Sequence, residues 1–414
     1  MAILYLIGIR VFHLILMIIS PFNAKAKLWL VGRKDIFKRL KENINANDKI
    51  YWFHCASLGE FEQGRPVIEL FKKEHSDCKI LLTFYSPSGY EIRKNYEYAD
   101  YVYYLPLDTP LNAKKFLHIV NPKVVFFIKY EFWYFFLKEI GKRDIPLYLV
   151  SGIFRKSQRF FKPNGIKSRK MLRWFTHFFV QNEESAELLR SIRIPNVTVT
   201  GDTRFDRVHQ IAQQSKDLPL IERFSANKPV LVAGSTWKPD EEIIIEYFNS
   251  TPNQLKVIVA PHEIHNENIQ RIIRTVSRDK KSLKYSEANE SNIEKADLLI
   301  IDSIGTLSSV YKYGKFAYIG GGFGKGIHNI LEAATFGLPV IFGPNYKKFK
   351  EAVDLINRKA AFMINDLNEL ASTLNSLIHD ENMINESGKT AATYVEKNRG
   401  AARQILKKVL NDKS

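Results

Sequence analysis

Five glycines stand within the seven residues 320–326, a density that suits a loop holding an anion. Glycine lets the backbone approach a ligand closely and adopts φ > 0 without strain. The apolar run 316–319 before the loop predicts a strand. The run 330–336 after it predicts a helix that begins near His328 and Asn329. A strand, a glycine loop and a helix start predict a phosphate site, because helix-end amides favour anions.

Glu332 lies one turn into that predicted helix. A carboxylate there can accept hydrogen bonds from the two hydroxyls of a ribose, as acidic residues do in nucleotide-binding α/β folds. The alternative is an ordinary tight turn of an α/β domain. The spacing matches neither the Walker motif, since Lys325 is followed by Gly326, nor the dinucleotide fingerprint. Nucleotide binding therefore requires another fold type.

Small and polar residues follow several predicted strands in the first half of the chain. They are Ser57, Gly59 and Glu60 after strand 49–53, Ser86 and Ser88 after strand 80–84, Glu131 after strand 124–128, and Arg155 after strand 147–150. Ligands of a parallel sheet bind at the carboxyl ends of its strands, so we expect these residues to gather at one site. Arg155 belongs to a basic stretch that would make this site positive.

The loop with His262, Glu263 and His265 offers possible metal ligands. Its spacing is not that of an H-E-x-x-H zinc site, and no third histidine or cysteine is near in sequence. We therefore interpret it as a strand-end loop facing a ligand cleft, and we expect no metal.

The predicted strands alternate with helical stretches, which is typical of parallel sheets covered by helices on both faces. They cover residues 49–53, 80–84, 102–105, 124–129, 147–150, 178–181 and 197–200, then 230–233, 256–259, 298–301, 316–319 and 339–342. We expect a membrane-associating helix over 1–24, a first domain over 25–210, a linker over 211–227 and a second domain over 228–414.

The composition is that of a globular protein with a strongly basic balance. The 414 residues include 61 Lys and Arg against 44 Asp and Glu, a formal net charge of +17. This charge predicts an acidic partner, which could be a nucleic acid, an anionic lipid or a phosphorylated substrate. Cys55 and Cys78 are the only cysteines, so no disulfide framework is expected and a reducing compartment fits.

Residues 2–21 are apolar except for Arg10 and His13, and a basic segment follows them over 25–39. The pattern does not fit a cleaved signal peptide, which begins with positive charge and ends with small residues. In a spanning helix a central arginine costs about 2.5–3.5 kcal/mol. We therefore predict a helix that lies in or dips into one leaflet, with its basic flank on anionic headgroups of the cytoplasmic side. The alternative is a buried first helix of a soluble domain.

Several motifs in a fixed order resemble those of the 3-deoxy-D-manno-octulosonic acid (Kdo) transferases, glycosyltransferases of the GT-B architecture. They are F-H-C-A-S-L-G-E-F-E (53–62), S-P-S-G (86–89), K-Y-E-F-W (129–133), Q-N-E-E-S-A (181–186), V-T-G-D-T-R-F-D (199–206), A-G-S-T-W (233–237), G-G-G-F-G-K-G-I-H-N-I-L-E (320–332) and F-G-P-N (342–345). The resemblance runs from about residue 10 to 400 and implies two Rossmann-like domains facing a central cleft.

The resemblance implies transfer of Kdo from CMP-Kdo to the lipid A precursor, with inversion at the anomeric carbon and without metal or cofactor. Its expected partners are CMP-Kdo, the lipid A precursor and an anionic membrane surface, and no nucleic acid. The expected location is the cytoplasmic face of the inner membrane, in lipopolysaccharide biosynthesis.

The resemblance also implies roles for individual residues. Glu60 matches the general base and Glu131 a second functional acidic residue. The implied CMP-Kdo site contains Ser235, Thr236, Pro261, His262, Gly322, Phe323, Gly324, Gly326, His328, Asn329 and Glu332. The expected acceptor site contains Ser57, Gly59, Ser86, Ser88 and Arg155.

Two positions depart from the family pattern. Lys129 stands where the family commonly has a glutamate, and His262 stands where it commonly has an arginine that contacts CMP. In this sequence either His262 or His265 would have to make the contact with CMP in place of that arginine.

Two other classes of function compete with this interpretation. A nucleic-acid-binding protein would fit the charge, but no RRM-like, zinc-finger or helix-turn-helix pattern is present. The stronger alternative is another GT-B glycosyltransferase that uses a UDP-sugar and a membrane lipid.

Overall fold

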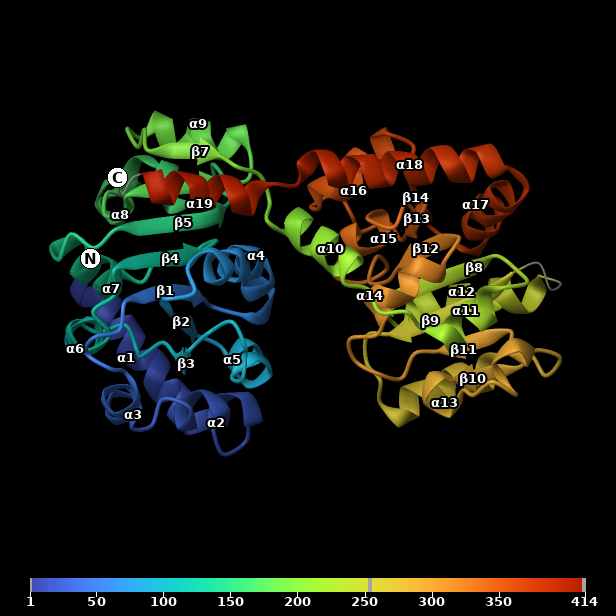
Figure 1. The fold of residues 1–414 in the computed structure, drawn as a ribbon, viewed down its shortest axis with the longest axis horizontal. Coiled ribbons are helices and arrows are strands. Elements are labelled where there is room, and N and C mark those ends of the chain that lie inside the picture. The colour runs from blue at the N-terminus through green and yellow to red at the C-terminus, as the bar shows by residue number, and fades with distance from the viewer. Residues whose placement is uncertain (1, 252–254, 412–414) are drawn as a thin grey trace. The chain divides into compact units, whose positions relative to one another are not determined.

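The computed structural model describes residues 2–251 and 255–411. These residues form two compact units (Figure 1). The first contains the described residues up to Arg207 together with those from Arg399 onward, and the second contains Val208–Asn398. Each unit is built around one parallel sheet of seven strands. The predicted fold class, with two parallel-sheet domains, is therefore confirmed.

The first sheet has the strand order β3-β2-β1-β4-β5-β6-β7. Its strands are β1 (Ile50–Cys55), β2 (Lys79–Phe84), β3 (Tyr101–Tyr104), β4 (Val124–Ile128), β5 (Leu147–Gly152), β6 (His177–Val180) and β7 (Val197–Val199). All five residues of β4 are buried. Strands that helices cover on both faces become continuous apolar runs, which is why the sequence predicts this sheet well.

Helices cover both faces of the first sheet. The helices of the first unit are α2 (Ala24–Val31), α3 (Ile36–Asn43), α4 (Leu58–Glu74), α5 (Pro87–Arg93), α6 (Pro110–Val120), α7 (Tyr134–Lys142), α8 (Ile166–Leu172), α9 (Glu183–Ser191) and α19 (Ala401–Asn411). The helix α10 (Arg204–Gln213) begins in this unit and continues into the second unit at Val208. One core cluster joins α3, α6, α7 and α9 to the sheet, and a second joins α4 and α19 to its other face.

The position of α19 differs from the predicted domain boundaries. Its residues Ile405, Leu406 and Val409 are buried in the same cluster as Phe71 of α4, so they complete the core of the first unit. The carboxylate of Asp206 accepts hydrogen bonds from the backbone amides at the start of α19, at 2.5 and 2.9 Å. The expected second domain over 228–414 therefore ends at Asn398 in this structure.

The second sheet has the order β10-β11-β9-β8-β12-β13-β14. Its strands are β8 (Val230–Thr236), β9 (Lys256–Pro261), β10 (Ser282–Lys284), β11 (Leu298–Ile300), β12 (Phe316–Ile319), β13 (Val340–Phe342) and β14 (Ala361–Met363). The sequence does not predict the edge strands β10 and β14, which have three residues each.

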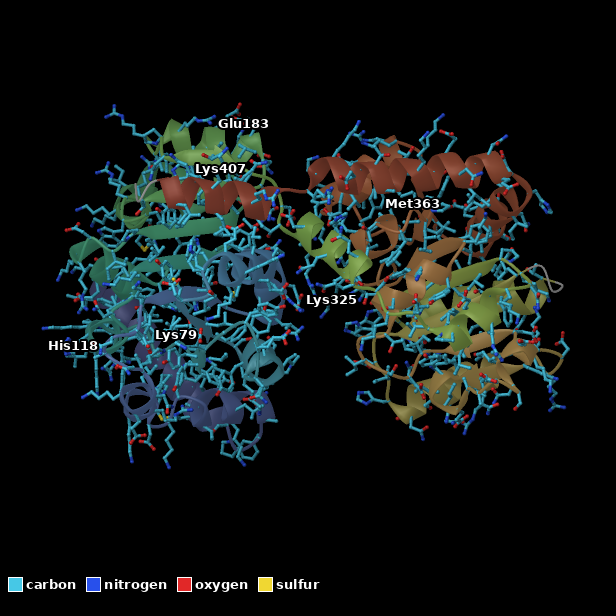
Figure 2. The ribbon with its side chains drawn as sticks, viewed as in Figure 1. Lys79, His118, Glu183, Lys325, Met363 and Lys407 are labelled. Atoms are coloured by element: carbon cyan, nitrogen blue, oxygen red, sulfur yellow. The ribbon has the colours of Figure 1, made fainter. Side chains whose placement is uncertain are left out.

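Helices of the second unit are α11 (Pro219–Ser225), α12 (Lys238–Ser250), α13 (Asn266–Thr275), α14 (Leu307–Val310), α15 (Leu331–Ala334), α16 (Lys350–Asn357), α17 (Leu367–His379) and α18 (Glu381–Asn398). Much of the expected linker over 211–227 is the helix α11, which buries Ile221 and Phe224 in this unit. Figure 2 shows the side chains of both units and labels Lys325, an exposed residue of the glycine loop.

The apolar N-terminal helix is α1 (Ala2–Ile19), and none of its residues is buried. One side packs against the rest of the first unit: the Tyr5 hydroxyl donates a 2.7 Å hydrogen bond to Asp108, and the Phe12 ring meets Trp29 edge-on. The other side exposes large apolar side chains, namely Ile3, Leu4, Ile7, Val11, Leu14, Ile15, Met17 and Ile18. By length and composition this helix could cross a membrane, and it does not form the buried first helix that the sequence leaves open.

Candidate active site

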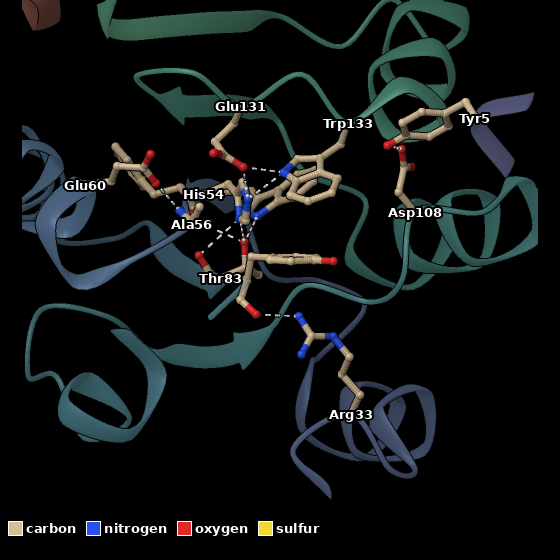
Figure 3. A network of polar contacts seen from close by, with 12 residues as sticks. Tyr5, Arg33, His54, Ala56, Glu60, Thr83, Asp108, Glu131 and Trp133 are labelled. Atoms are coloured by element: carbon tan, nitrogen blue, oxygen red, sulfur yellow. Dashed lines mark hydrogen bonds and ion pairs between the residues drawn. The ribbon is translucent and has the colours of Figure 1, made fainter. Parts of the chain in front are cut away.

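Glu60 lies in the first turn of α4, directly after the carboxyl end of β1 (Figure 3). Ser57 is the N-cap residue of this helix, with an extended backbone. Oε2 of Glu60 accepts a hydrogen bond of 2.6 Å from the backbone N–H of Ala56. This bond satisfies an amide at the strand–helix turn and holds the carboxyl group at the edge of the sheet.

Glu131 lies in the loop after β4, the strand that neighbours β1. The residue is almost completely buried, at 7% exposure. Oε2 of Glu131 lies 3.2 Å from Nε2 of His54 and accepts a hydrogen bond from Nε1 of Trp133. Parallel pairing of β1 with β4 therefore brings Glu60 and Glu131 to the same edge, as the sequence predicts.

The environment of Glu60 suits a base that works near neutral pH. Burial and the charge of Glu131 raise the pKa of Glu60 to about 7, against the opposing effects of the Ala56 amide and of Lys129. A carboxylate with a pKa near the working pH is an efficient proton acceptor. Lys129 itself has a left-handed backbone with φ of 65°, which is uncommon for a residue with a side chain and often marks a functional site.

A chain of hydrogen bonds between buried polar side chains leads to Glu131. His54, on β1, and Thr83, on β2, are both fully buried, and Oγ1 of Thr83 lies 2.9 Å from Nδ1 of His54. Trp52 donates a hydrogen bond of 2.7 Å from Nε1 to the same hydroxyl. Neither His54 nor Thr83 is among the site residues predicted from the sequence. The available signal is that each is a polar residue within a buried apolar strand.

The expected acceptor residues lie at the carboxyl ends of neighbouring strands of the first sheet. Gly59 is exposed, and a side chain built there would meet nothing within 4 Å. The hydroxyls of Ser86 and Ser88 are 2.6 Å apart at the start of α5. Arg155 is exposed after β5, with its guanidinium 6.0 Å from the ring centre of Tyr130. These positions lie at the same edge of the first sheet as Glu60 and Glu131.

In the second unit the glycine loop is held against the sheet by its own backbone. Gly321 has φ of 90°, and its amide donates a 2.9 Å hydrogen bond to Asp240. The amides of Gly324, Gly326 and His328 also donate to carbonyls within the loop or next to it. These amides therefore already donate hydrogen bonds within the protein. An anion would have to bind other backbone amides, such as those of Gly322 and Phe323.

The helix predicted after this loop is shorter than expected. The run 330–336 forms only the four-residue helix α15, which begins at Leu331. Glu332 is its second residue and accepts a hydrogen bond of 2.9 Å from Nδ2 of Asn329. The prediction of a helix start near His328 is wrong, and a helix of one turn adds little dipole to bind a phosphate.

Three aromatic rings stack beside the loop. The ring centre of His262 lies 4.6 Å from that of Trp237 and 4.5 Å from that of His328. Nε1 of Trp237 donates a 2.9 Å hydrogen bond to Nε2 of His328. Burial and the nearby His262 lower the pKa of His328, so it is neutral with its proton on Nδ1. Trp237 belongs to the motif A-G-S-T-W (233–237) but is not among the predicted site residues.

The remaining donor-site residues end two neighbouring strands. Ser235 has φ of 53° near the end of β8, and Pro261 ends β9. Thr236 is buried, and its hydroxyl donates a 3.0 Å hydrogen bond to Glu241, which also pairs with Arg271. The hydroxyl of Thr236 thus points into the fold, whereas the ring stack and the loop remain accessible.

The acidic residue Asp240, in the first turn of α12, connects the glycine loop to Trp237 and was not predicted as a site residue. Its carboxylate accepts 2.9 Å hydrogen bonds from the hydroxyl of Tyr318 and from the backbone amides of Trp237 and Gly321. In the described part of the chain, no group of three or more His, Cys, Asp or Glu side chains could hold a metal ion.

Comparison with known proteins gives a consistent result. Residues 33–207 match the model of a family described as 3-deoxy-D-manno-octulosonic-acid transferase (kdotransferase). The chain is 28% identical to the 3-deoxy-D-manno-octulosonic acid transferase of Aquifex aeolicus over 376 residues, which are 88% of this chain and 97% of that protein. It is 27% identical to the enzyme of Rickettsia bellii, over 89% of this chain and 90% of that one.

The fold is similar to that of solved structures with different names. The UDP-GlcNAc 2-epimerase from Neisseria meningitidis, bound to UDP-GlcNAc, matches with a TM-score of 0.60 and 16% identity, over 87% of this chain and 99% of that one. A putative UDP-N-acetylglucosamine 2-epimerase from Listeria monocytogenes matches with a TM-score of 0.59 and 13% identity, over 87% and 95%. At such identities the likeness shows the shared two-domain fold.

Proposed function

We propose that this chain, whose resemblance to the Kdo transferases is confirmed along most of its length, is an enzyme that transfers Kdo from CMP-Kdo to the lipid A precursor. The observation that carries the proposal is the pair of carboxyl groups, Glu60 and Glu131, at the ends of neighbouring strands. Both residues lie within the segment that matches the family model.

In the proposed reaction Glu60 is the general base. It takes the proton from the acceptor hydroxyl while that oxygen forms a bond to the anomeric carbon of Kdo. The bond from this carbon to the phosphate of CMP breaks, and CMP leaves with the electron pair. Attack opposite to the leaving group inverts the anomeric carbon, and no metal is required. The pKa of Glu60, raised by burial and by Glu131 to about 7, supports this role.

The donor is proposed to bind in the second unit. The phosphate would bind beside the glycine loop. There His328 carries a proton on Nδ1, and the ring of His262 stacks against the ring of His328. His262, one of the two histidines that the sequence leaves for this role, would replace the arginine that the family commonly has. Glu332, beside Asn329, would accept the ribose hydroxyls.

The acceptor is proposed to come from the membrane. The net charge of +17 favours a phosphorylated glycolipid, and the exposed apolar side of α1 favours contact with lipid. In this proposal α1 lies on the cytoplasmic face of the inner membrane. The basic residues after α1 would then sit at the level of the headgroups.

The test is an assay of the purified full chain with lipid A precursor and radiolabelled sugar donors. Transfer from CMP-Kdo is expected, and transfer from UDP-sugars is not. Transfer from a UDP-sugar alone would instead support the alternative glycosyltransferase. Absence of transfer from either donor, with a folded protein, would contradict the proposal.

A further inference from the structure

Trp52, Thr83 and His54 form a chain of hydrogen bonds that ends at Glu131 (Figure 3). The groups that can only donate a proton determine which atom donates and which accepts along this chain. An indole N–H can only donate, so Trp52 makes the Thr83 hydroxyl an acceptor at 2.7 Å. The proton of that hydroxyl is then free to point to Nδ1 of His54, 2.9 Å away. The other acceptor within reach of this proton, the carbonyl of Phe53, is farther at 3.5 Å.

This direction selects one tautomer of His54. When Nδ1 accepts the hydroxyl proton, the ring proton lies on Nε2, and Nε2 lies 3.2 Å from Oε2 of Glu131. Nε1 of Trp133 lies within hydrogen-bond distance of both Oε2 of Glu131 and Nε2 of His54, and its contact with Oε2 is the shorter one, so we assign its proton to Glu131. Two donors then converge on Glu131, and an ionised carboxylate is the form that accepts both.

The opposite tautomer is also within reach of the structure. Nδ1 lies 3.2 Å from the main-chain oxygen of Thr83 and could donate to it instead. Nε2 would then accept a hydrogen bond from Nε1 of Trp133, 3.1 Å away, and its lone pair would also face Glu131 and repel a carboxylate, which favours the protonated acid. The hydroxyl of Thr83 is the feature that separates the two arrangements.

We propose that Thr83 acts as a positioning residue that fixes the His54 tautomer and so keeps Glu131 ionised beside Glu60. The inference rests on the proposed function, since it assigns to Glu131 the task of tuning Glu60 as the base. The negative charge of Glu131 is one of the two main causes that raise the pKa of Glu60. A neutral Glu131 would therefore make Glu60 a weaker base.

Other titratable groups face Glu60 and Glu131, and the substitutions at Thr83 leave these groups in place. Those around Glu60 and Glu131 are Lys129 and Tyr130 from the loop after β4, Cys55 from β1, and Tyr85 from the loop after β2. Lys129 supplies the one opposite charge acting on Glu60 in this set, and it lies on the same loop as Glu131.

The experiment compares Thr83→Val with Thr83→Ser in the full chain. Valine keeps the shape but removes the hydroxyl, whereas serine keeps the hydroxyl. The acid limb of the pH profile of kcat/KM should move to lower pH by about one unit in Thr83→Val, since loss of a nearby like charge lowers a carboxyl pKa. In Thr83→Ser the acid limb of this profile should stay at the same pH as in the original protein. Identical limbs in both variants would overturn the inference.

A second measurement does not depend on turnover. ¹⁵N spectra of labelled histidine distinguish a proton on Nε2 from one on Nδ1, and the signal of His54 is identified by its absence in His54→Gln. We expect Nε2–H in the original protein and in Thr83→Ser, and Nδ1–H in Thr83→Val. An Nδ1–H tautomer in the original protein would overturn the inference, even if Thr83→Val failed to fold.

A failure of the proposed function can be distinguished from a failure of the inference about Thr83. If Glu60→Gln kept full turnover, Glu60 would not be the base and the proposed function would lose its main residue. The spectra would still decide the tautomer. If Glu60→Gln abolished turnover while Thr83→Val changed neither limb nor tautomer, only the inference about Thr83 would fall.

Discussion

Nε1 of Trp237 donates a hydrogen bond of 2.9 Å to Nε2 of His328, and this bond ties the end of β8 to the glycine loop. It also orients His328, because the nitrogen that accepts cannot carry the ring proton. Nδ1 is thereby left as the donor that a bound anion could use. The geometry of the second unit thus prepares a neutral histidine as a hydrogen-bond donor.

Replacing Trp237 with phenylalanine should weaken binding of CMP-Kdo. The aromatic ring is kept, but the indole N–H that fixes His328 is lost. A neutral hydrogen bond contributes about 0.5–1.5 kcal/mol, so calorimetry should show a loss of up to about tenfold in affinity. The matched control is Trp174→Phe in the first unit, where Trp174 packs against Tyr134. Equal losses in both variants would contradict the assigned role.

Glu60→Gln should reduce turnover while CMP-Kdo still binds. Glutamine keeps the size and an acceptor for the Ala56 amide but cannot take a proton. General base catalysis contributes about 10²- to 10⁴-fold, so kcat should fall by that order. Glu74→Gln, at the exposed end of the same helix, is the control and should keep its turnover. Near-full turnover in Glu60→Gln would remove Glu60 from the mechanism.

The same residue predicts a pH dependence of stability. The pKa of Glu60 is raised from 4.5 to about 7, so between these values the native state binds more protons than the unfolded state. Stability from this group is therefore fully present below pH 4.5 and is lost as the pH rises through about 7. Glu60→Gln should be more stable relative to the original protein at pH 8 than at pH 5. Melting temperatures of the two proteins at both pH values test this, and a constant difference would contradict it.

The exposed side of α1 should determine binding to membranes. Leu4, Ile7 and Ile18 are 75%, 53% and 64% exposed. Changing all three to serine should release the protein from anionic vesicles by more than about tenfold, since apolar burial contributes about 25 cal/mol per Å². Cosedimentation with such vesicles measures this. Deleting residues 1–21 should have the same effect while CMP binding survives.

The control for α1 changes exposed apolar residues elsewhere. Ile92, Ile166 and Ile304 are 58%, 66% and 91% exposed and lie outside α1. Their combined replacement by serine should leave vesicle binding in place. If both triple variants bound vesicles equally, α1 would not be the membrane contact.

Glu332→Ala should weaken CMP binding by at least about tenfold, because hydrogen bonds to a charged group contribute about 1.5–3 kcal/mol each. The loss should be much smaller for a 2′,3′-dideoxyribose analogue, which has no hydroxyls to donate. Calorimetry with both ligands separates a ribose contact from a structural role of the Asn329–Glu332 pair. Parallel losses for the two ligands would contradict the ribose assignment.

The sheets could be predicted from the sequence because buried strands such as β4 are continuous apolar runs. The convergence of Glu60 and Glu131 follows from the same pattern, since parallel neighbours end at one edge. The hydrogen bond between His54 and Thr83 could not be predicted, because it depends on the register that pairs these two residues. The helix after the glycine loop was overestimated. Residues 330–336 have helical composition, but the chain leaves the helix after Ala334 and reaches φ of 72° at Gly337.

The return of α19 to the first unit has a consequence for biosynthesis. Because Ile405, Leu406 and Val409 close a core that begins with β1, this core remains incomplete until α19 has left the ribosome. The second unit, Val208–Asn398, is continuous in sequence and can fold earlier. A nascent chain stopped before residue 399 should thus carry a folded second unit beside a first unit with an uncovered apolar face. Such a chain would be a natural client of chaperones.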